Sequence, residues 1–189
     1  MKAMSLSPDT TRHWTYADYC ALPDDGRRYQ IVEGELFVNP APIVKHQAVL
    51  LNLYAALRVR AEREGGLCLA SPIDVLLADD TVVQPDLVYL AKARRPAPDA
   101  KNLTEAPDLV VEVLSPSTRR LDVVRKRAVY AGHGVREFWI VDPELDRVEV
   151  LVADGRGGLE ARPPVSEGAV RSEVVLPGFE VPIDELFRV

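Results

Sequence analysis

The sequence predicts an α/β protein with a central mixed β-sheet flanked by helices, and three observations support this class. Apolar residues recur at helical spacing between residues 44 and 64. Short runs rich in Val, Leu and Ile, bounded by turn residues, follow that stretch as candidate strands. A second helical segment, residues 119–131, separates two of these runs. Because helices alternate with strands in this order, we expect a mixed sheet with an N-terminal β-hairpin and C-terminal β additions around it.

Length and composition set broad limits on the protein. A chain of 189 residues predicts one domain over residues 1–189, with its core at about residues 28–152. The net charge of −6 argues against a protein that coats polyanions over its whole surface. Cys20 and Cys68 form no CxxC motif, which indicates a reducing compartment. No apolar run approaches 18 residues and residues 1–12 lack a signal core, so we expect a cytoplasmic protein with no membrane partner.

The N-terminal part should contain a short helix and a hairpin. Thr15 and Asp18 have capping-box spacing, which predicts a helix that ends near Leu22. Residues 29–38 have the pattern of a β-hairpin with Glu33-Gly34 at its turn.

A long helix and further strands should follow. The helix over residues 44–64 places Val49, Leu50, Leu53, Leu57 and Ala61 on one face and ends at Gly65-Gly66. Strands are then expected over residues 67–77, 82–90, 109–114, 135–142 and 147–152. A loop over residues 92–102 and a helix over residues 119–131, capped by Ser117 or Thr118, separate some of them. Short β segments should fill the tail.

Two carboxylates interrupt apolar strands. Glu112 lies in the run from Leu109 to Leu114, and Asp86 lies in the predicted strand over residues 82–90. An ionised carboxylate buried without a partner costs several kcal/mol, so each group would normally be neutralised or find a cation. Successive side chains of a strand point to opposite faces of the sheet. If the two strands are neighbours, the side chains of Asp86 and Glu112 can therefore converge on one face. A salt bridge to an arginine would explain either residue alone, whereas a shared Mg²⁺ or Mn²⁺ ion would explain both.

A set of linked motifs then resembles a known family. The motifs in this sequence are Gln84-Pro85-Asp86, residues 106–118, Lys126, Tyr130, residues 134–137 and 139–142, the hairpin residues 29–35 and a Pro-X₄-His stretch ending at His46. Together they resemble the Uma-two family, a bacterial group within the PD-(D/E)xK nuclease superfamily. The resemblance covers roughly residues 15–150.

The resemblance implies a restriction-endonuclease-like core and a metal-dependent nuclease that acts on DNA, most often as a homodimer. Asp86 and Glu112 would be the acidic motif residues and would ligate Mg²⁺, or Mn²⁺, with the backbone carbonyl of Val113. The lysine expected two residues after Glu112 is Leu114 in this chain. The resemblance implies that Lys126, on the following helix, takes its catalytic place.

Lys126 also has a simpler interpretation. Asp122 and Lys126 are spaced i,i+4, and an exposed helix pair of this kind contributes only about 0.2–0.5 kcal/mol. Tyr130, four residues further on, is expected to pack in the helix rather than to take part in chemistry.

Further residues are candidates for supporting roles in the site and for a nucleic-acid contact. Glu35 is a candidate third acidic contact and His46 a candidate site member, while Gln30 stands where relatives often carry Glu. The cationic candidates for a DNA contact are Arg119, Arg120, Arg125, Lys126 and Arg127, with Lys92, Arg94 and Arg95 in the preceding loop. A charged helix face can equally be a solvated surface.

Two other functions remain open at this point. A non-catalytic interaction module that retains the fold would be consistent with Leu114 and the negative net charge. An enzyme that acts on a nucleotide or another phosphoester would use the same acidic residues.

Overall fold

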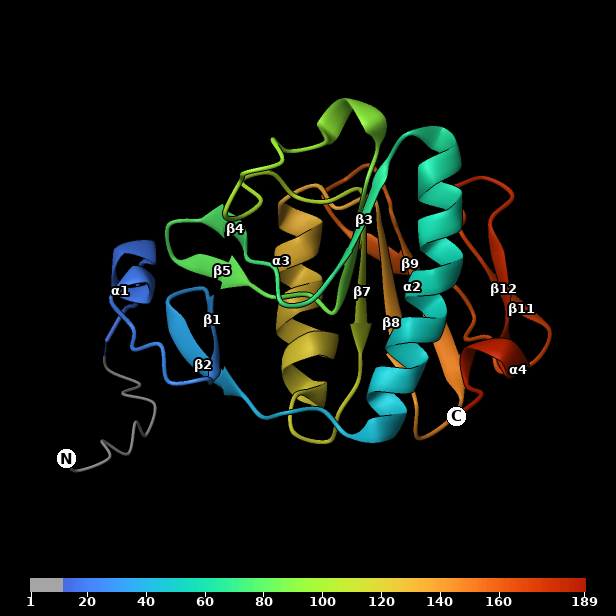
Figure 1. The fold of residues 1–189 in the computed structure, drawn as a ribbon, viewed down its shortest axis with the longest axis horizontal. Helices are drawn as coiled ribbons and strands as arrows, with labels where there is room; N and C mark the ends of the chain where they lie inside the picture. The colour runs from blue at the N-terminus through green and yellow to red at the C-terminus, as the bar shows by residue number, and fades with distance from the viewer. Residues whose placement is uncertain (1–11) are drawn as a thin grey trace.

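A six-stranded mixed sheet forms the centre of the computed structural model, which describes residues 12–189 (Figure 1). Its strand order is β10-β9-β8-β7-β6-β3. The strands are β3 (Leu67–Ala70), β6 (Leu87–Leu90), β7 (Leu109–Val113), β8 (Glu137–Asp142), β9 (Arg147–Ala153) and β10 (Leu159–Ala161). β7 and β8 run parallel, and the other neighbours run antiparallel. The predicted α/β class with a mixed central sheet is therefore confirmed.

A four-stranded sheet at the N-terminal side contains the predicted hairpin. Its order is β2-β1-β5-β4, with bounds β1 (Arg28–Val32), β2 (Glu35–Asn39), β4 (Val75–Ala78) and β5 (Thr81–Val83). Both turn residues of the hairpin have positive φ, 52° at Glu33 and 77° at Gly34, which matches the twist of the strands. The helix α1 (Tyr16–Cys20) precedes it, and its capping box between Thr15 and Asp18 is formed as expected.

Helices cover both faces of the central sheet, as the ribbon shows for β7 and β8 (Figure 1). On one face lies α2 (Val44–Glu64), which has the predicted bounds and ends at Gly65 with φ 71°. Its five predicted core residues are buried. On the other face, a π-helical turn, η2 (Leu121–Lys126), continues directly into α3 (Arg127–Gly132). Each face therefore has its own apolar core, and η2 with α3 replaces the single regular helix that the sequence predicts.

Two of the predicted strands are each divided in two, and these expectations were wrong. The segment over residues 67–77 splits at Ser71-Pro72 into β3 and β4. The segment over residues 82–90 splits at Gln84-Pro85-Asp86 into β5 and β6. In both cases the two halves belong to different sheets. Proline has no N–H to donate to a strand ladder, so a proline is where the chain can leave one sheet for the other.

The remaining elements complete the C-terminal part. They are η1 (Lys92–Arg94), β11 (Ala169–Arg171), β12 (Glu180–Pro182) and α4 (Ile183–Leu186). β11 and β12 pair as a separate two-stranded sheet, in agreement with the expected C-terminal β additions. Within residues 12–189, no helix combines the length and the apolar character needed to cross a membrane. The N-terminal stretch for which no signal core is predicted lies, up to residue 11, outside the described residues.

Candidate active site

Asp86 and Glu112 are brought together by the pairing of β6 with β7. Leu87 lies opposite Val111, so the same antiparallel register places Asp86, one residue before β6, opposite Glu112. The Asp86 Oδ2 atom accepts a hydrogen bond of 2.8 Å from the backbone N–H of Val113. Asp86 is 8% exposed and Glu112 is 2% exposed. The two acids thus share one buried face, although Asp86 lies between β5 and β6 and not inside a strand as the sequence predicts.

Lys126 reaches this pair from the helix on the same face. Its Nζ atom lies 2.9 Å from Glu112 Oε1 and 3.1 Å from Asp122 Oδ1. The lysine is 1% exposed, so the interpretation as an exposed helix pair is wrong. Asp122 is also buried, and it is a third carboxylate that the sequence argument treats only as the partner of an exposed lysine. The π-helical turn η2 carries both residues, and such turns are frequent at functional sites.

Tyr130 belongs to the same cluster. Its hydroxyl donates a hydrogen bond of 2.5 Å to Glu112 Oε1, and the side chain is fully buried. Sequence reasoning assigned this residue to packing, which its edge-on contact with Phe138 also provides. The signal that could have revealed the second role is its i,i+4 spacing from Lys126, since residues four apart share one helix face.

The environment changes the proton affinity of these groups. Burial raises the pKa of Glu112 to about 8, and the neighbouring Asp122 and Asp86 add to the rise against the opposing effect of Lys126. Burial lowers the pKa of Lys126, but Glu112 and Asp122 outweigh it and leave this pKa above its ordinary value. Burial beside Glu112 raises the pKa of the Tyr130 hydroxyl. At neutral pH the lysine is therefore cationic and the tyrosine keeps its proton.

A cavity of about 460 Å³ opens onto this cluster. Asp86, Glu112, Asp122 and Lys126 line it, as does Leu114, which occupies the position where the superfamily motif has lysine. His46, near the start of α2, is 5% exposed and lines it as well. Its Nε2 atom lies 3.4 Å from Asp86 Oδ2, while its Nδ1 atom is buried without a hydrogen-bond partner in the described part of the chain. Of the predicted site residues, Asp86, Glu112, Lys126 and His46 thus meet at one cavity, and Glu35 does not line it.

The donor set fits a hard divalent cation. Asp86 Oδ1 and Glu112 Oε2 have no hydrogen-bond partner within residues 12–189. The contacts with Val113 and His46 involve Asp86 Oδ2, and those with Lys126 and Tyr130 involve Glu112 Oε1. Both acids line the cavity, and so does Val113, whose backbone N–H donates to Asp86 Oδ2. Two carboxylates with waters suffice for Mg²⁺. No group of three or more His, Cys, Asp or Glu side chains in the described residues is arranged to hold a metal, so waters or a backbone carbonyl would have to complete the ligands of an ion at Asp86 and Glu112.

Glu35 lies apart from the cluster. It is on β2 of the smaller sheet, where its carboxylate forms an ion pair with Arg125. Arg125 also donates to the carbonyl of Val32 at 2.9 Å. This arginine joins the hairpin to the helix, so the expected third acid beside Asp86 and Glu112 is Asp122 rather than Glu35. Gln30 is fully buried, and its Oε1 atom accepts a hydrogen bond of 2.8 Å from the backbone N–H of Gln84, which lines the cavity.

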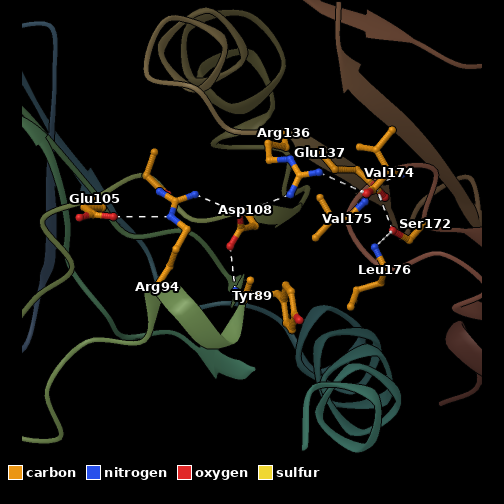
Figure 2. Close-up of polar contacts among 12 residues, drawn as sticks. Tyr89, Arg94, Glu105, Asp108, Arg136, Glu137, Ser172, Val174, Val175 and Leu176 are labelled. Atoms are coloured by element: carbon orange, nitrogen blue, oxygen red, sulfur yellow. Dashed lines mark hydrogen bonds and ion pairs between the residues drawn. The ribbon is translucent and has the colours of Figure 1, made fainter. Parts of the chain in front are cut away.

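Most of the predicted cationic surface is engaged within the protein. Arg119 pairs with Asp142 at 2.6 Å, and Arg127 donates to the carbonyl of Leu159 at 2.8 Å. Arg94 is held by Asp108 at 3.0 Å, with Glu105 beside it (Figure 2). Of the three arginines proposed to contact DNA, Arg120 is the one for which residues 12–189 provide no ion pair. The helix therefore does not present a continuous basic face.

Fold and site together define a restriction-endonuclease-like α/β domain with a buried acidic cluster at the junction of two sheets. The chain belongs to the Uma2 (Uma-two) family, whose model is described as "Putative restriction endonuclease" and matches residues 16–184. A solved structure with a similar fold is that of a "putative nuclease belonging to DUF820" from Anabaena variabilis ATCC 29413, with a TM-score of 0.79. It is 20% identical, and the alignment covers 92% of this chain and 97% of that one. No curated protein matches the sequence.

Proposed function

We propose that this protein is a metal-dependent endonuclease that hydrolyses phosphodiester bonds in DNA. The observation that carries the proposal is the meeting of Asp86, Glu112 and the buried Lys126 at one cavity. Membership of a family described as restriction endonucleases gives this chemistry its reaction class. A buried lysine among three carboxylates has a high energetic cost that packing alone would avoid, which favours a functional role.

Asp86 and Glu112 would hold Mg²⁺ or Mn²⁺ through their free oxygens, with the Val113 carbonyl as a further ligand. When bound, the metal would polarise the phosphoryl oxygen and lower the pKa of an attacking water. Tyr130 and Lys126 both donate to Glu112 Oε1, which orients the carboxylate and leaves Oε2 for the cavity. The cationic Nζ of Lys126 stabilises negative charge that develops on the phosphoryl group. The Nε2 atom of His46 lies 3.4 Å from Asp86 Oδ2 and would help to position this carboxylate.

DNA is the substrate that the family description favours, because restriction endonucleases act on nucleic acid. We place the protein in the cytoplasm, where the free cysteines Cys20 and Cys68 would stay reduced. The homodimer expected from the sequence stays a prediction, which light scattering during size-exclusion chromatography would check.

The test is a cleavage assay with purified full-length protein. Labelled DNA and RNA oligonucleotides, plasmid DNA and a small phosphodiester are incubated with and without Mg²⁺ or Mn²⁺. Asp86→Asn and Glu112→Gln should each abolish metal-dependent cleavage, whereas Glu160→Gln, an exposed acid on β10, should not. If both site variants cleave as fast as the wild type, the activity belongs to another site and the proposal is wrong.

The non-catalytic module is the main rival, and the same protein distinguishes it. Isothermal titration with Mg²⁺ should give a binding signal that Asp86→Asn removes. Metal binding without cleavage of any substrate would favour the module. Cleavage of the small phosphodiester without cleavage of any oligonucleotide would instead favour a different phosphoester substrate.

A further inference from the structure

The outer part of the active-site cavity contains a group of apolar residues, here called the proline rim. Its members, which line the cavity and are exposed or half-buried, are Pro40, Pro42, Ile43 and Pro116. The Ile43 side chain is 64% exposed there although it is large and apolar. Proline fixes its own backbone φ, so three prolines in this part of the lining give a shape that exists before any ligand binds. A preformed apolar opening above a polar floor is the arrangement of a site that takes up one flat, apolar group together with a charged one.

The floor of the cavity is deeply buried. Glu112 and Lys126 are 2% and 1% exposed, so a scissile phosphate must enter the cavity to reach them. A phosphate on an intact duplex is held at the outside of a stiff helix, and its neighbours on both sides must follow it. An unpaired strand has no such constraint, because a single nucleotide can be turned into a pocket.

The charges around the cavity also fit a single strand better than a duplex. The arginines of the helical segment are largely engaged within the protein, as Arg119 is with Asp142. Arg28 on β1 lines the cavity. Its guanidinium donates a hydrogen bond of 3.2 Å to the Pro40 carbonyl and forms no ion pair within residues 12–189. Its positive charge is therefore available beside the apolar rim. One local cation can neutralise one flanking phosphate, whereas duplex binding normally uses a row of them.

We infer that the site accepts an unpaired nucleotide of a DNA strand, with the base against the proline rim and a flanking phosphate at Arg28. This inference rests on the proposed nuclease function and adds the class of substrate. The volume of about 460 Å³ lies in the range of pockets that hold one small ligand. Base contact with apolar and aromatic surfaces is tolerant of sequence, so the site should cut unpaired DNA with little sequence preference.

The first test compares strands of one sequence. The full-length protein is incubated with Mg²⁺ and a labelled DNA oligonucleotide that is single-stranded, fully paired, or paired with a central bulge. The single strand and the bulge should be cut at least about tenfold faster than the duplex. Equal rates on the single strand and the duplex would overturn the inference and leave the nuclease proposal intact. Faster cutting of an RNA strand would support the unpaired nucleotide and overturn DNA as the substrate.

The second test separates binding from cleavage. Fluorescence anisotropy measures the Kd of the same labelled single strand in EDTA. Ile43→Asp and Arg28→Gln should each raise the Kd about tenfold. The matched controls are Val59→Asp, an exposed apolar position on α2, and Arg156→Gln, an exposed arginine in the β9–β10 turn; neither should change it. Rim-dependent binding in a protein that cuts nothing would support the inference while the nuclease proposal fails. Equal Kd values for all four variants would contradict it.

Discussion

Two buried glutamates on adjacent strands of the central sheet have opposite surroundings. Glu137 on β8 is fully buried, and its Oε2 atom accepts from the Ser172 hydroxyl at 3.0 Å and from the backbone N–H groups of residues 173–175 (Figure 2). Its Oε1 atom accepts from the Trp139 indole at 2.7 Å. Glu112 on β7 has donors on one oxygen only, two further carboxylates nearby, and a cavity in front of it.

This difference distinguishes a structural anchor, Glu137, from a candidate active-site residue, Glu112. Every donor around Glu137 is supplied by the protein and the side chain is fully buried, so this carboxylate ties the C-terminal segment to the sheet and is not accessible to a ligand. Burial raises the pKa of Glu112, the neighbouring acids add to the rise, and one of its oxygens has no hydrogen-bond partner in the described residues. A carboxylate in an apolar strand is therefore not by itself the mark of a site. Repulsion from neighbouring charges and access to a cavity are the additional features.

The largest expected effect is the loss of activity in Glu112→Gln. An amide cannot replace a carboxylate as a metal ligand, so we expect the cleavage rate to fall about 10³-fold, similar to removal of a main electrostatic contact in other enzymes. Initial rates on a labelled oligonucleotide measure it. Glu137→Gln is the matched control, and it should keep the wild-type rate per folded molecule. A comparable loss of rate in both variants would remove the distinction between anchor and site.

The two substitutions should affect stability in the opposite order, with Glu137→Gln the more destabilising. In Glu137→Gln, an amide N–H would face donors that need an acceptor, so we expect the free energy of unfolding to fall by about 3 kcal/mol. Urea unfolding followed by tryptophan fluorescence measures this change. Glu112→Gln at pH 7 should be at least as stable as the wild type, because the buried acid opposes folding there. Equal destabilisation by the two substitutions would show that Glu112 is also an anchor.

The sequence predicts the helices and the hairpin well because their signals are local. The capping box at Thr15, the turn at Glu33-Gly34 and the glycine after residue 64 each act within a few residues. Pro72 and Pro85 are local signals of a break in a strand. However, an apolar run around a proline does not show which sheet each half of the run joins. That choice depends on partners far along the chain, so two predicted strands were too long.

For the site, sequence reasoning finds Asp86 and Glu112 by the cost of burying them, and Lys126 by resemblance. It misses Tyr130 and the role of Asp122, because a tyrosine or an acid on a helix has many ordinary uses. It also passes over Glu137, whose strand is as apolar as that of Glu112. The donors that distinguish Glu137 come from residues 172–175, about 35 positions later, and only the fold brings them there.

The pH dependence of stability provides a third, smaller contrast. The pKa of Glu112 is raised by burial to about 8 from an ordinary value of 4.5, so between these values the folded protein holds a proton that the unfolded chain has lost. Stability from this group is complete below pH 4.5 and is lost as the pH rises to 8, by up to about 1.4 kcal/mol per pH unit. Unfolding curves of metal-free protein at pH 5, 6 and 7 measure the slope. The difference from Glu112→Gln should grow over this range, and a constant difference would contradict the raised pKa.

The smallest effect is expected in Tyr130→Phe. This change removes the hydroxyl that donates to Glu112 Oε1 but keeps the ring against Phe138. A hydrogen bond to a charged group contributes about 1.5 kcal/mol, so the cleavage rate should fall about tenfold through poorer orientation of Glu112. Tyr89→Phe is the control, because its hydroxyl lies 3.3 Å from Glu64 on the other face of the sheet. Since Tyr130 positions a metal ligand, the metal concentration for half-maximal rate should rise as well. A merely structural tyrosine would lower stability and leave that concentration unchanged.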